Sequence, residues 1–180
     1  MSKNKRLAAS ILALGCLVWP LYGGAAQICN SHMTATTPDS QFVDNGDGTV
    51  TDKATGLTWM RCAVGQTWSS ATSTCSGTAV GYTWQTALSE ADGYSYAGHT
   101  DWRLPNDKEL ASLTERACYS PAINLDMFPN TDPSGVFWTS TPSAATVGDA
   151  WTVSMTSGNS RDDQTMTGNS FSVRLVRGGP

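Results

Sequence analysis

The sequence has few histidines, few basic residues and none of the short motifs that mark common enzymes. Its 180 residues include only His32 and His99, so a metal site or a catalytic triad that needs imidazoles has little to draw on. A phosphate-binding glycine loop, an H-E-x-x-H helix and a G-x-S-x-G turn are all missing. We therefore expect no cofactor, no bound metal and no catalytic residue.

Long apolar runs are also missing, except near the start of the chain. Three basic residues precede an apolar run over residues 7–21, and small residues at 24–26 precede Gln27. This order is typical of a secretory signal peptide, which we predict over residues 1–26. The apolar residues after Cys16 disfavour the alternative, a lipoprotein anchor. No second run could span a membrane, so we expect export to the periplasm, the cell surface or the medium.

Basic residues are scarce in the remainder of the chain. Outside the predicted signal peptide, eight Lys and Arg face fifteen Asp and Glu, which gives a formal net charge of −7. Such a surface argues against non-specific binding to nucleic acid or to anionic lipid. It also disfavours a polysulfated ligand, unless a local basic patch overrides the average.

Four cysteines follow the predicted signal peptide: Cys29, Cys62, Cys75 and Cys118. An even number in an exported chain indicates two disulfides, for which three pairings are possible. The nearest pair, Cys62 and Cys75, would close a polar loop and leave Cys29 to join Cys118. A four-ligand zinc site is the alternative, but the spacings contain no C-x-x-C pair.

The chain is organised around residues 101–116, DWRLPNDKELASLTER. Asn106 suits a helix N-cap, and Glu109 stands where its carboxylate can reach back to the cap. An apolar stripe follows at helical spacing, formed by Leu110, Leu113 and Ala117. We predict a strand-like segment that turns into an amphipathic helix and forms a corner of the core. A ligand contact through Arg103 or Asp101 is the alternative.

The segments before this corner predict an arm, a meander and a helix. Residues 27–41 have little periodicity and are expected to form an extended N-terminal arm. Residues 42–60 read as three short strands joined by Gly- and Asn/Asp-containing turns. A polar loop over 62–82 and a short helix over 83–92 follow.

The segments after the corner predict mainly strands. An irregular stretch over 118–133 leads to strands over 137–141 and 150–155, a polar edge segment over 161–167 and a final strand over 171–177. Strands, two helices and strands again predict an α+β domain with two short helices and an antiparallel sheet.

The turn after Asp44 resembles a calcium loop, but its spacing is wrong. The alternate positions that should carry oxygen ligands are occupied by Gly46 and Gly48. A β-turn is the better interpretation, although Asp44, Asp47 and Asp52 leave a non-standard metal site open.

Six tryptophans follow the predicted signal peptide. Four occupy alternating or helical apolar positions and are expected in the core: Trp59, Trp84, Trp138 and Trp151. Trp68 lies in the predicted disulfide loop, where we expect it to be exposed and suited to stacking on a sugar. Trp68, Arg103 and Arg161 are therefore our candidate ligand-binding residues.

Several segments resemble a known bacterial family. The sequence resembles the C-terminal domain of the Legionella collagen-like protein, long catalogued as a domain of unknown function. The matching segments are FVDNGDGTVTDKATGLTWMRC (42–62), YTWQTAL (82–88), GHTDWRLPNDKEL (98–110), PAINLDMFPNT (121–131), VFWTSTP (136–142), AWTV (150–153) and VRLVRGG (173–179). They follow in order within residues 42–180, which we take as the domain.

The resemblance implies a C-type-lectin-like fold, shared with the formylglycine-generating enzyme group. The active-site cysteines of that group and the calcium-dependent sugar motifs of true C-type lectins have no counterpart in this sequence. The resemblance to the named family member implies a role in adhesion, because its domain is associated with binding to sulfated glycosaminoglycans and to host or cell surfaces. The present sequence departs from it by its negative charge and by having no collagen-like repeat.

Three functions fit these observations. The first is a secreted or surface-exposed, non-catalytic binding module for carbohydrate or another cell-surface component. The second is a structural or protein-interaction subunit of a surface appendage or envelope complex, which would expose a large apolar patch. The third is an enzyme of the formylglycine-generating-enzyme-like fold, which would need a cleft with perturbed titratable groups. The sequence leaves the oligomeric state open.

Overall fold

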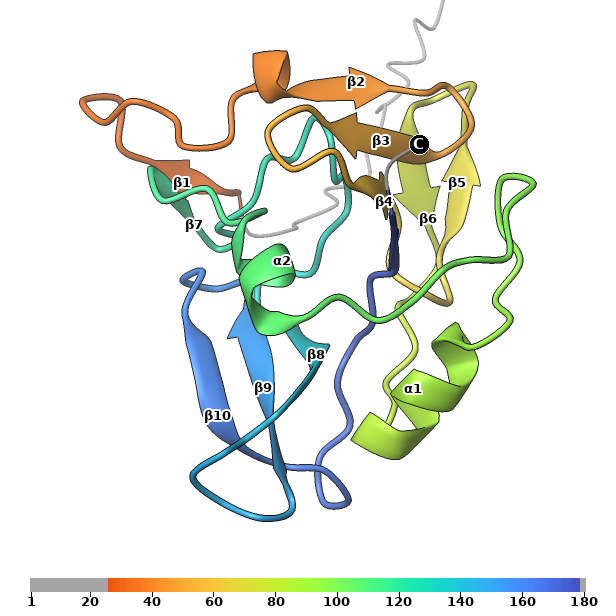
Figure 1. Cartoon of the computed structure of the whole chain (residues 1–180). Coiled ribbons are helices and arrows are strands. Elements are labelled where there is room, and N and C mark those ends of the chain that lie inside the picture. Colours follow the sequence, from red (N-terminus) through yellow and green to blue (C-terminus); the bar gives the residue numbers. More distant parts are fainter. Residues whose placement is uncertain (1–25, 179–180) are drawn as a thin grey trace, which may run out of the picture.

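A computed structural model describes residues 26–178, so nearly all of the predicted signal peptide lies outside the described residues. The described chain forms four small antiparallel sheets and two short α-helices (Figure 1). The α+β class predicted from the sequence is therefore confirmed. Neither of the two helices is long and apolar enough to cross a membrane.

The larger sheet has the strand order β11-β4-β3-β2, and three of its strands come from the first half of the chain. Its meander consists of β2 (Phe42–Asp44), β3 (Thr49–Asp52) and β4 (Thr58–Met60), as predicted. The C-terminal strand β11 (Val176–Arg177) pairs with β4. The two ends of the described domain are thus joined in one sheet.

The turn between β2 and β3 uses its acidic side chains to hold the backbone. The Asp44 carboxylate accepts a hydrogen bond of 2.8 Å from the Gly46 N–H, and Asp47 accepts one of 2.9 Å from the Thr49 N–H. Gly46 has φ +79°, a conformation that glycine adopts without steric cost. The other Asp44 oxygen is 2.6 Å from Arg61 Nη1. These contacts hold the backbone of the turn.

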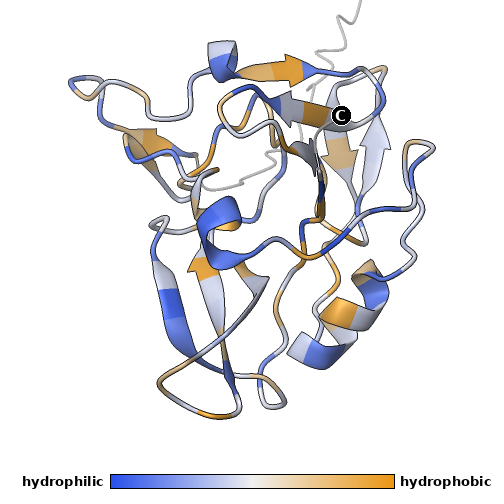
Figure 2. Ribbon diagram, viewed as in Figure 1, coloured by the Kyte–Doolittle hydropathy of each residue, from blue (hydrophilic) through white to orange (hydrophobic). Residues whose placement is uncertain are grey.

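A second sheet contains three strands in the order β10-β9-β8. They are β8 (Val136–Pro142), β9 (Asp149–Ser154) and β10 (Ser160–Thr165), drawn in blue in Figure 1. The edge strand β10 carries polar and charged residues throughout, which Figure 2 shows as a hydrophilic strand. A charged edge of this kind disfavours pairing with a strand of another molecule.

Two further strand pairs lie where the sequence predicted no regular structure. In the N-terminal arm, β1 (Ile28–Cys29) pairs with β7 (Cys118–Tyr119). In the expected polar loop, β5 (Thr67–Ser69) pairs with β6 (Thr74–Ser76). Both pairs are only two or three residues long, which is too short to give a clear alternating pattern in the sequence.

The two helices begin as the sequence predicted. Helix α1 (Trp84–Ala91) is capped by Thr83, and α2 (Asp107–Ala111) begins with a complete capping box between Asn106 and Glu109. Helix α2 ends sooner than its apolar stripe suggested. The three residues of that stripe are nevertheless buried: Leu110, Leu113 and Ala117.

The stretch around α2 joins the two core clusters, which explains why the chain is organised around it. Leu110 and Leu113 belong to the first cluster, with residues such as Trp59. Trp102 and Leu104 belong to the second, with residues such as Trp138. Helix α2 itself packs against β8 and β9.

The predicted last strand is regular only at its end. Val173 and Leu175 are buried as expected, but Arg174, predicted to lie on the opposite face, is buried too. Its guanidinium donates to the backbone carbonyls of Met60 and Arg61 and to the Thr131 hydroxyl. Burial lowers the pKa of Arg174 to about 9, so it remains a cation at neutral pH.

Candidate functional site

The three candidate ligand-binding residues lie in separate parts of the fold. Trp68 is on β5, Arg103 precedes α2 and Arg161 is on the edge strand β10 (Figure 1). They do not form one site, and each has to be judged by its own surroundings.

Trp68 is half-buried rather than exposed. The Arg61 guanidinium lies over its ring, 4.2 Å from the centroid. A Cβ atom on Gly48 would lie 2.8 Å from Trp68 Cγ, so the indole also covers the backbone of the β2–β3 turn. The expectation that Trp68 is exposed was wrong, because its ring packs against the turn and Arg61.

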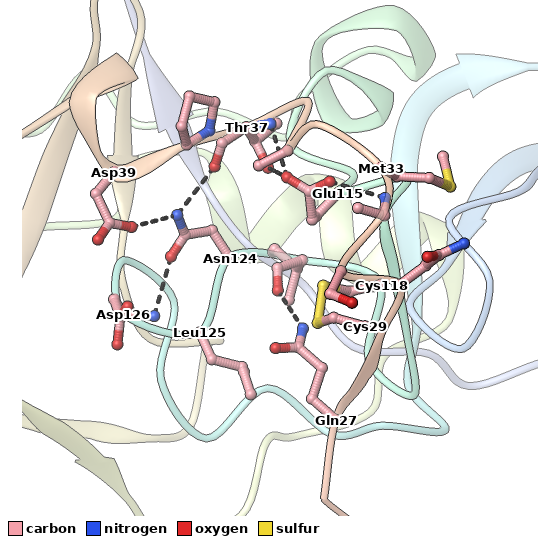
Figure 3. A pocket seen from close by; sticks show the side chains of 16 residues that line it. Gln27, Cys29, Met33, Thr37, Asp39, Glu115, Cys118, Asn124, Leu125 and Asp126 are labelled. Atoms are coloured by element: carbon pink, nitrogen blue, oxygen red, sulfur yellow. Dashed lines mark hydrogen bonds between the residues drawn. A yellow bond between two sulfur atoms is a disulfide. The ribbon is translucent and has the colours of Figure 1, made fainter.

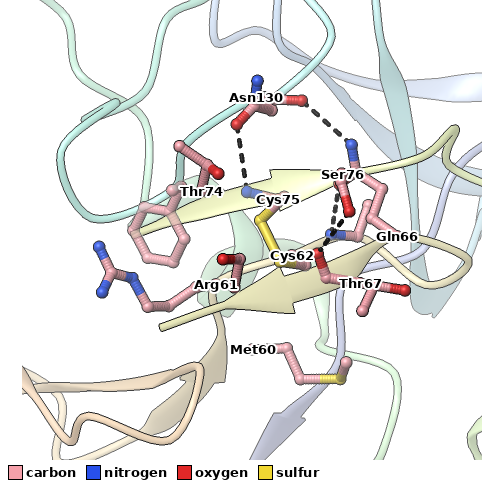
Figure 4. Close-up of a disulfide and its surroundings, with 12 residues drawn as sticks. Met60, Arg61, Cys62, Gln66, Thr67, Thr74, Cys75, Ser76 and Asn130 are labelled. Atoms are coloured by element: carbon pink, nitrogen blue, oxygen red, sulfur yellow. Dashed lines mark hydrogen bonds between the residues drawn. A yellow bond between two sulfur atoms is a disulfide. The ribbon is translucent and has the colours of Figure 1, made fainter. Parts of the chain in front are cut away.

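The two disulfides have the pairing suggested above, in which the cysteines nearest in sequence are bonded to each other. Cys62 is bonded to Cys75, and Cys29 is bonded to Cys118. Figure 4 shows the first bridge beside Asn130, whose side-chain oxygen accepts a hydrogen bond of 3.1 Å from the Cys75 N–H. Both bridges fix local structure, and neither cysteine pair is free to bind a metal.

Trp151, expected in the core, is also half-buried and belongs to neither core cluster.

Arg161 is exposed, but its guanidinium is engaged: Nη2 lies 2.7 Å from the Asp163 carboxylate. Hydrogen bonds from Arg161 and then Gln164 lower the pKa of Asp163 to about 2. Arg161 therefore belongs to a surface ion pair, and it does not line either of the two cavities of about 500 and 480 Å³ in the fold.

A cavity of about 500 Å³ lies between the N-terminal arm and residues 115–126; we call it the arm pocket (Figure 3). Its polar side chains are used to hold the arm. Gln27 Nε2 donates to the carbonyls of Pro121 and Ile123, and Asn124 Nδ2 donates to the Thr37 carbonyl. The arm pocket is a seam within the fold, and these hydrogen bonds join its two sides.

A second cavity, of about 480 Å³, opens between the two helices; we call it the helix cleft. Leu88, Ala91 and Asp92 come from α1 and its C-terminal end, and Trp102, Arg103, Leu104, Asn106, Glu109 and Ser140 complete the lining. Its walls thus combine apolar side chains with charged and neutral polar ones. This mixture is typical of sites for small polar ligands.

Arg103 and Glu109 form a closed pair at the rim of the helix cleft. Arg103 Nη1 and Nη2 each donate to one Glu109 oxygen, both at 2.7 Å. These hydrogen bonds lower the pKa of Glu109 and raise that of Arg103. Glu109 also accepts from the Asn106 N–H as part of the helix cap, so the pair is fixed in place.

Three other groups in the helix cleft lack a partner within residues 26–178. They are the Asp92 carboxylate, the Asn106 side-chain NH₂ and the Ser140 hydroxyl. Together they offer an acceptor, a donor and a group that can do both. Polar groups that the fold leaves unpaired around an apolar floor are available to a ligand.

Sequence reasoning found one wall of the helix cleft and missed the others. Arg103 was proposed directly, and Asn106 was noticed only as a cap. Asp92 ends one helix and Ser140 lies within β8, so only the packing of α1 and α2 beside β8 brings them to one cavity. No local pattern could have indicated this.

The sequence suggested a possible metal site formed by Asp44, Asp47 and Asp52. Among residues 26–178, no three His, Cys, Asp or Glu side chains are grouped so as to hold a metal ion. Asp52, the third member of the suggested set, accepts hydrogen bonds from Gln41, Ala54 and Thr55 instead.

Comparison with known proteins supports the resemblance noted in the sequence. The model of the Lcl C-terminal domain matches residues 48–177, which include β3 and β4 of the meander, both helices and the second sheet. No curated protein matches the chain. On the strength of this match, the chain belongs to the Lcl C-terminal domain family.

Proposed function

We propose that this protein is an exported, non-catalytic module that binds carbohydrate of a cell surface in the helix cleft. One observation carries the proposal: three unpaired polar groups surround an apolar floor in an open cavity of about 480 Å³. Export is supported by the predicted signal peptide and by the two disulfides.

The chemistry of the helix cleft suits a sugar. A sugar hydroxyl can donate to Asp92, and another can accept from Asn106, while Ser140 serves in either role. The apolar face of a pyranose ring can pack against Leu88 and the edge of Trp102. Each polar contact uses a group that the fold leaves unpaired.

A binding role is favoured over catalysis by the state of the carboxylates. Arg103 holds Glu109 in two hydrogen bonds and lowers its pKa, so Glu109 stays ionised and is a poor proton donor at neutral pH. Hydrolysis of a glycoside needs one protonated carboxyl group. The lining of the helix cleft contains no histidine or cysteine that could replace it.

The family resemblance adds a proposal about architecture. We take the fold to be C-type-lectin-like, and the two short helices beside antiparallel sheets are compatible with that assignment. Fold alone does not define a ligand, and the groups that would bind carbohydrate are those that line the helix cleft.

A second function, protein interaction within a surface complex, is favoured by a different observation. Ile28, Met33 and Tyr119 are 50%, 49% and 51% exposed. All three line one cavity of about 470 Å³ beside the β1–β7 strand pair. This apolar patch lies outside the helix cleft.

A glycan array with the purified protein tests the first function. We expect binding that persists at physiological ionic strength, since hydrogen bonds and packing are less screened than surface charges. Ser140→Ala should weaken binding by about threefold to tenfold through loss of one hydrogen bond. Ser157→Ala is the matched control, because Ser157 lines the cavity beside the β1–β7 pair and not the helix cleft.

The outcomes separate the alternatives. Binding that Ser140→Ala leaves unchanged would place the glycan outside the helix cleft. Loss of binding in the presence of a calcium chelator would indicate that binding requires a metal ion, for which the β2–β3 turn is the candidate site. Failure to bind any glycan would overturn the carbohydrate proposal and favour protein interaction.

A further inference from the structure

The helix cleft carries one negative charge that nothing balances. Arg103 and Glu109 neutralise each other through their paired hydrogen bonds. The remaining charged group of the lining, Asp92, is exposed and has no ionic partner within residues 26–178. The net charge of the lining is therefore negative.

The position of Asp92 at the C-terminal end of α1 makes the electrostatic potential in the helix cleft more negative. Asp92 is the C-cap of α1, and its backbone N–H donates to the Leu88 carbonyl. A helix C-terminus carries partial negative charge, which disfavours a carboxylate there. Glu90 adds a second carboxylate in the last turn, and this turn contains no basic residue. The end of α1 that faces the helix cleft therefore attracts cations.

Basic side chains that could attract an anion are engaged elsewhere. Eight Lys and Arg residues lie within the described part of the chain, and Arg174 is fully buried. Five form ion pairs: Arg61, Arg103, Lys108, Arg161 and Arg177. Lys53 and Arg116 are exposed without such a pair, but neither lines the helix cleft.

We propose that the ligand of the helix cleft is a glycan with a free amino group, such as a de-N-acetylated hexosamine unit. This inference rests on the proposed function and specifies its ligand. The ligand ammonium pairs with the Asp92 carboxylate, while neighbouring hydroxyls bond to Asn106 and Ser140. A sulfated sugar would meet Asp92 as a like charge and would find Arg103 already occupied by Glu109.

Selectivity for the amine comes from Asp92. An ammonium group offers three donors and a full positive charge, whereas an N-acetyl group offers one neutral donor. Glu109 cannot serve the same purpose, because both of its oxygens accept from Arg103. Replacing Asp92 alone should therefore remove the preference for the amine while leaving the hydroxyl contacts.

Titration calorimetry with three matched oligosaccharides tests the proposal: a glucosamine tetramer, its fully N-acetylated form and a heparin tetrasaccharide. We expect the glucosamine tetramer to bind more tightly than the acetylated form by up to about fivefold, the upper value for one exposed charge pair. Asp92→Asn should bring the two affinities together. Asp126→Asn, an exposed residue of the arm pocket, makes the same charge change and should leave the ratio unaltered.

Each outcome bears on one of the two proposals. Equal affinity for the free and acetylated tetramers, or tighter binding of the heparin fragment, would overturn amine recognition and leave carbohydrate binding standing. A preference for the amine that survives Asp92→Asn but falls with Asp126→Asn would assign it to the arm pocket and overturn the role of Asp92. No binding of any tetramer would count against the carbohydrate function itself.

Discussion

Glu115 shows how one side chain can anchor a segment far away in the sequence. Its carboxylate accepts backbone hydrogen bonds from Thr36, Thr37 and Ala117 at 3.0, 2.8 and 2.8 Å. The hydroxyls of Thr36 and Thr37 donate to it as well. Glu115 is buried, and its carboxylate adds to the contacts that hold the N-terminal arm against the rest of the domain (Figure 3).

We predict that Glu115→Gln lowers the free energy of unfolding at neutral pH by about 2 kcal/mol, through loss of charge-assisted hydrogen bonds. Burial by itself raises the pKa of Glu115, but the hydrogen bonds from Thr36, Thr37 and Ala117 outweigh it, so the pKa is lowered from 4.5. A carboxyl group with a lowered pKa stabilises the fold above its unfolded pKa and loses that effect as the pH falls.

The difference between the native protein and Glu115→Gln should therefore shrink as the pH drops below 4.5. Urea unfolding of both proteins at neutral and acidic pH measures it. Glu90→Gln makes the same chemical change at an exposed position and should cost little. A difference that stays constant from neutral to acidic pH would contradict the assigned role of the Glu115 charge.

Trp68 and Arg174 mark the limit of sequence reasoning at the residue scale. Trp68 lies between polar residues, which suggested exposure, yet its ring covers Gly48 and Arg61. Arg174 alternates with apolar residues, which suggested the solvent face, yet it is buried and its Nη1 donates to the backbone carbonyls of Met60 and Arg61. In both cases a distant backbone segment decides the burial.

At the scale of elements, the two disulfides differ in what they join. Cys29–Cys118 connects β1 to β7 across a sequence separation of 89 residues. Cys62–Cys75 joins cysteines with a sequence separation of only 13 residues. A longer loop loses more conformational entropy in the unfolded chain when it is closed. The first bridge should therefore stabilise the domain more.

We predict that Cys29→Ala with Cys118→Ala lowers the free energy of unfolding by about 4.5 kcal/mol, and that Cys62→Ala with Cys75→Ala lowers it by about 3 kcal/mol. Denaturant unfolding of the two double variants provides the comparison. A larger loss from the shorter bridge would show that the β5–β6 hairpin, and not chain entropy, determines the effect.

Elements with a strong local signal were predicted well. The meander over β2, β3 and β4 has turn residues at fixed places, and α1 has a cap and an apolar face. Helix α2 ends at Ala111, before its stripe does, because the following residues continue into tight turns that still bury Leu113. The strand pairs β1–β7 and β5–β6 have no such signal.

At the scale of the whole molecule, charge is distributed so that few cations are free. The net charge outside the predicted signal peptide is −7. Five of the basic side chains in the described part of the chain are tied to carboxylates. The sequence predicted an acidic surface, and the structure shows that five of the eight basic side chains in residues 26–178 lie beside a carboxylate.

We predict that the protein elutes from a heparin column below physiological ionic strength, because polysulfated chains bind through several free cations at once. Asp163→Asn frees Arg161 and should delay elution slightly, since one exposed charge becomes available. Retention of the native protein well above physiological ionic strength would contradict the charge distribution described above.

The sequence by itself determined the family, the α+β class, the helix caps and the acidic character of the surface. These properties depend on local spacing, on composition or on motifs that stay together along the chain. Arg103 and Asn106, near the predicted corner, were visible for the same reason.

Only the tertiary structure decided which polar groups remain free. The helix cleft needs Asp92 from α1, Asn106 from the start of α2 and Ser140 from β8. Arg161 and Trp68, equally suitable by residue type, are occupied by Asp163 and Arg61. A binding site consists of groups left unsatisfied after folding, and the partners that satisfy the others lie far away in the sequence.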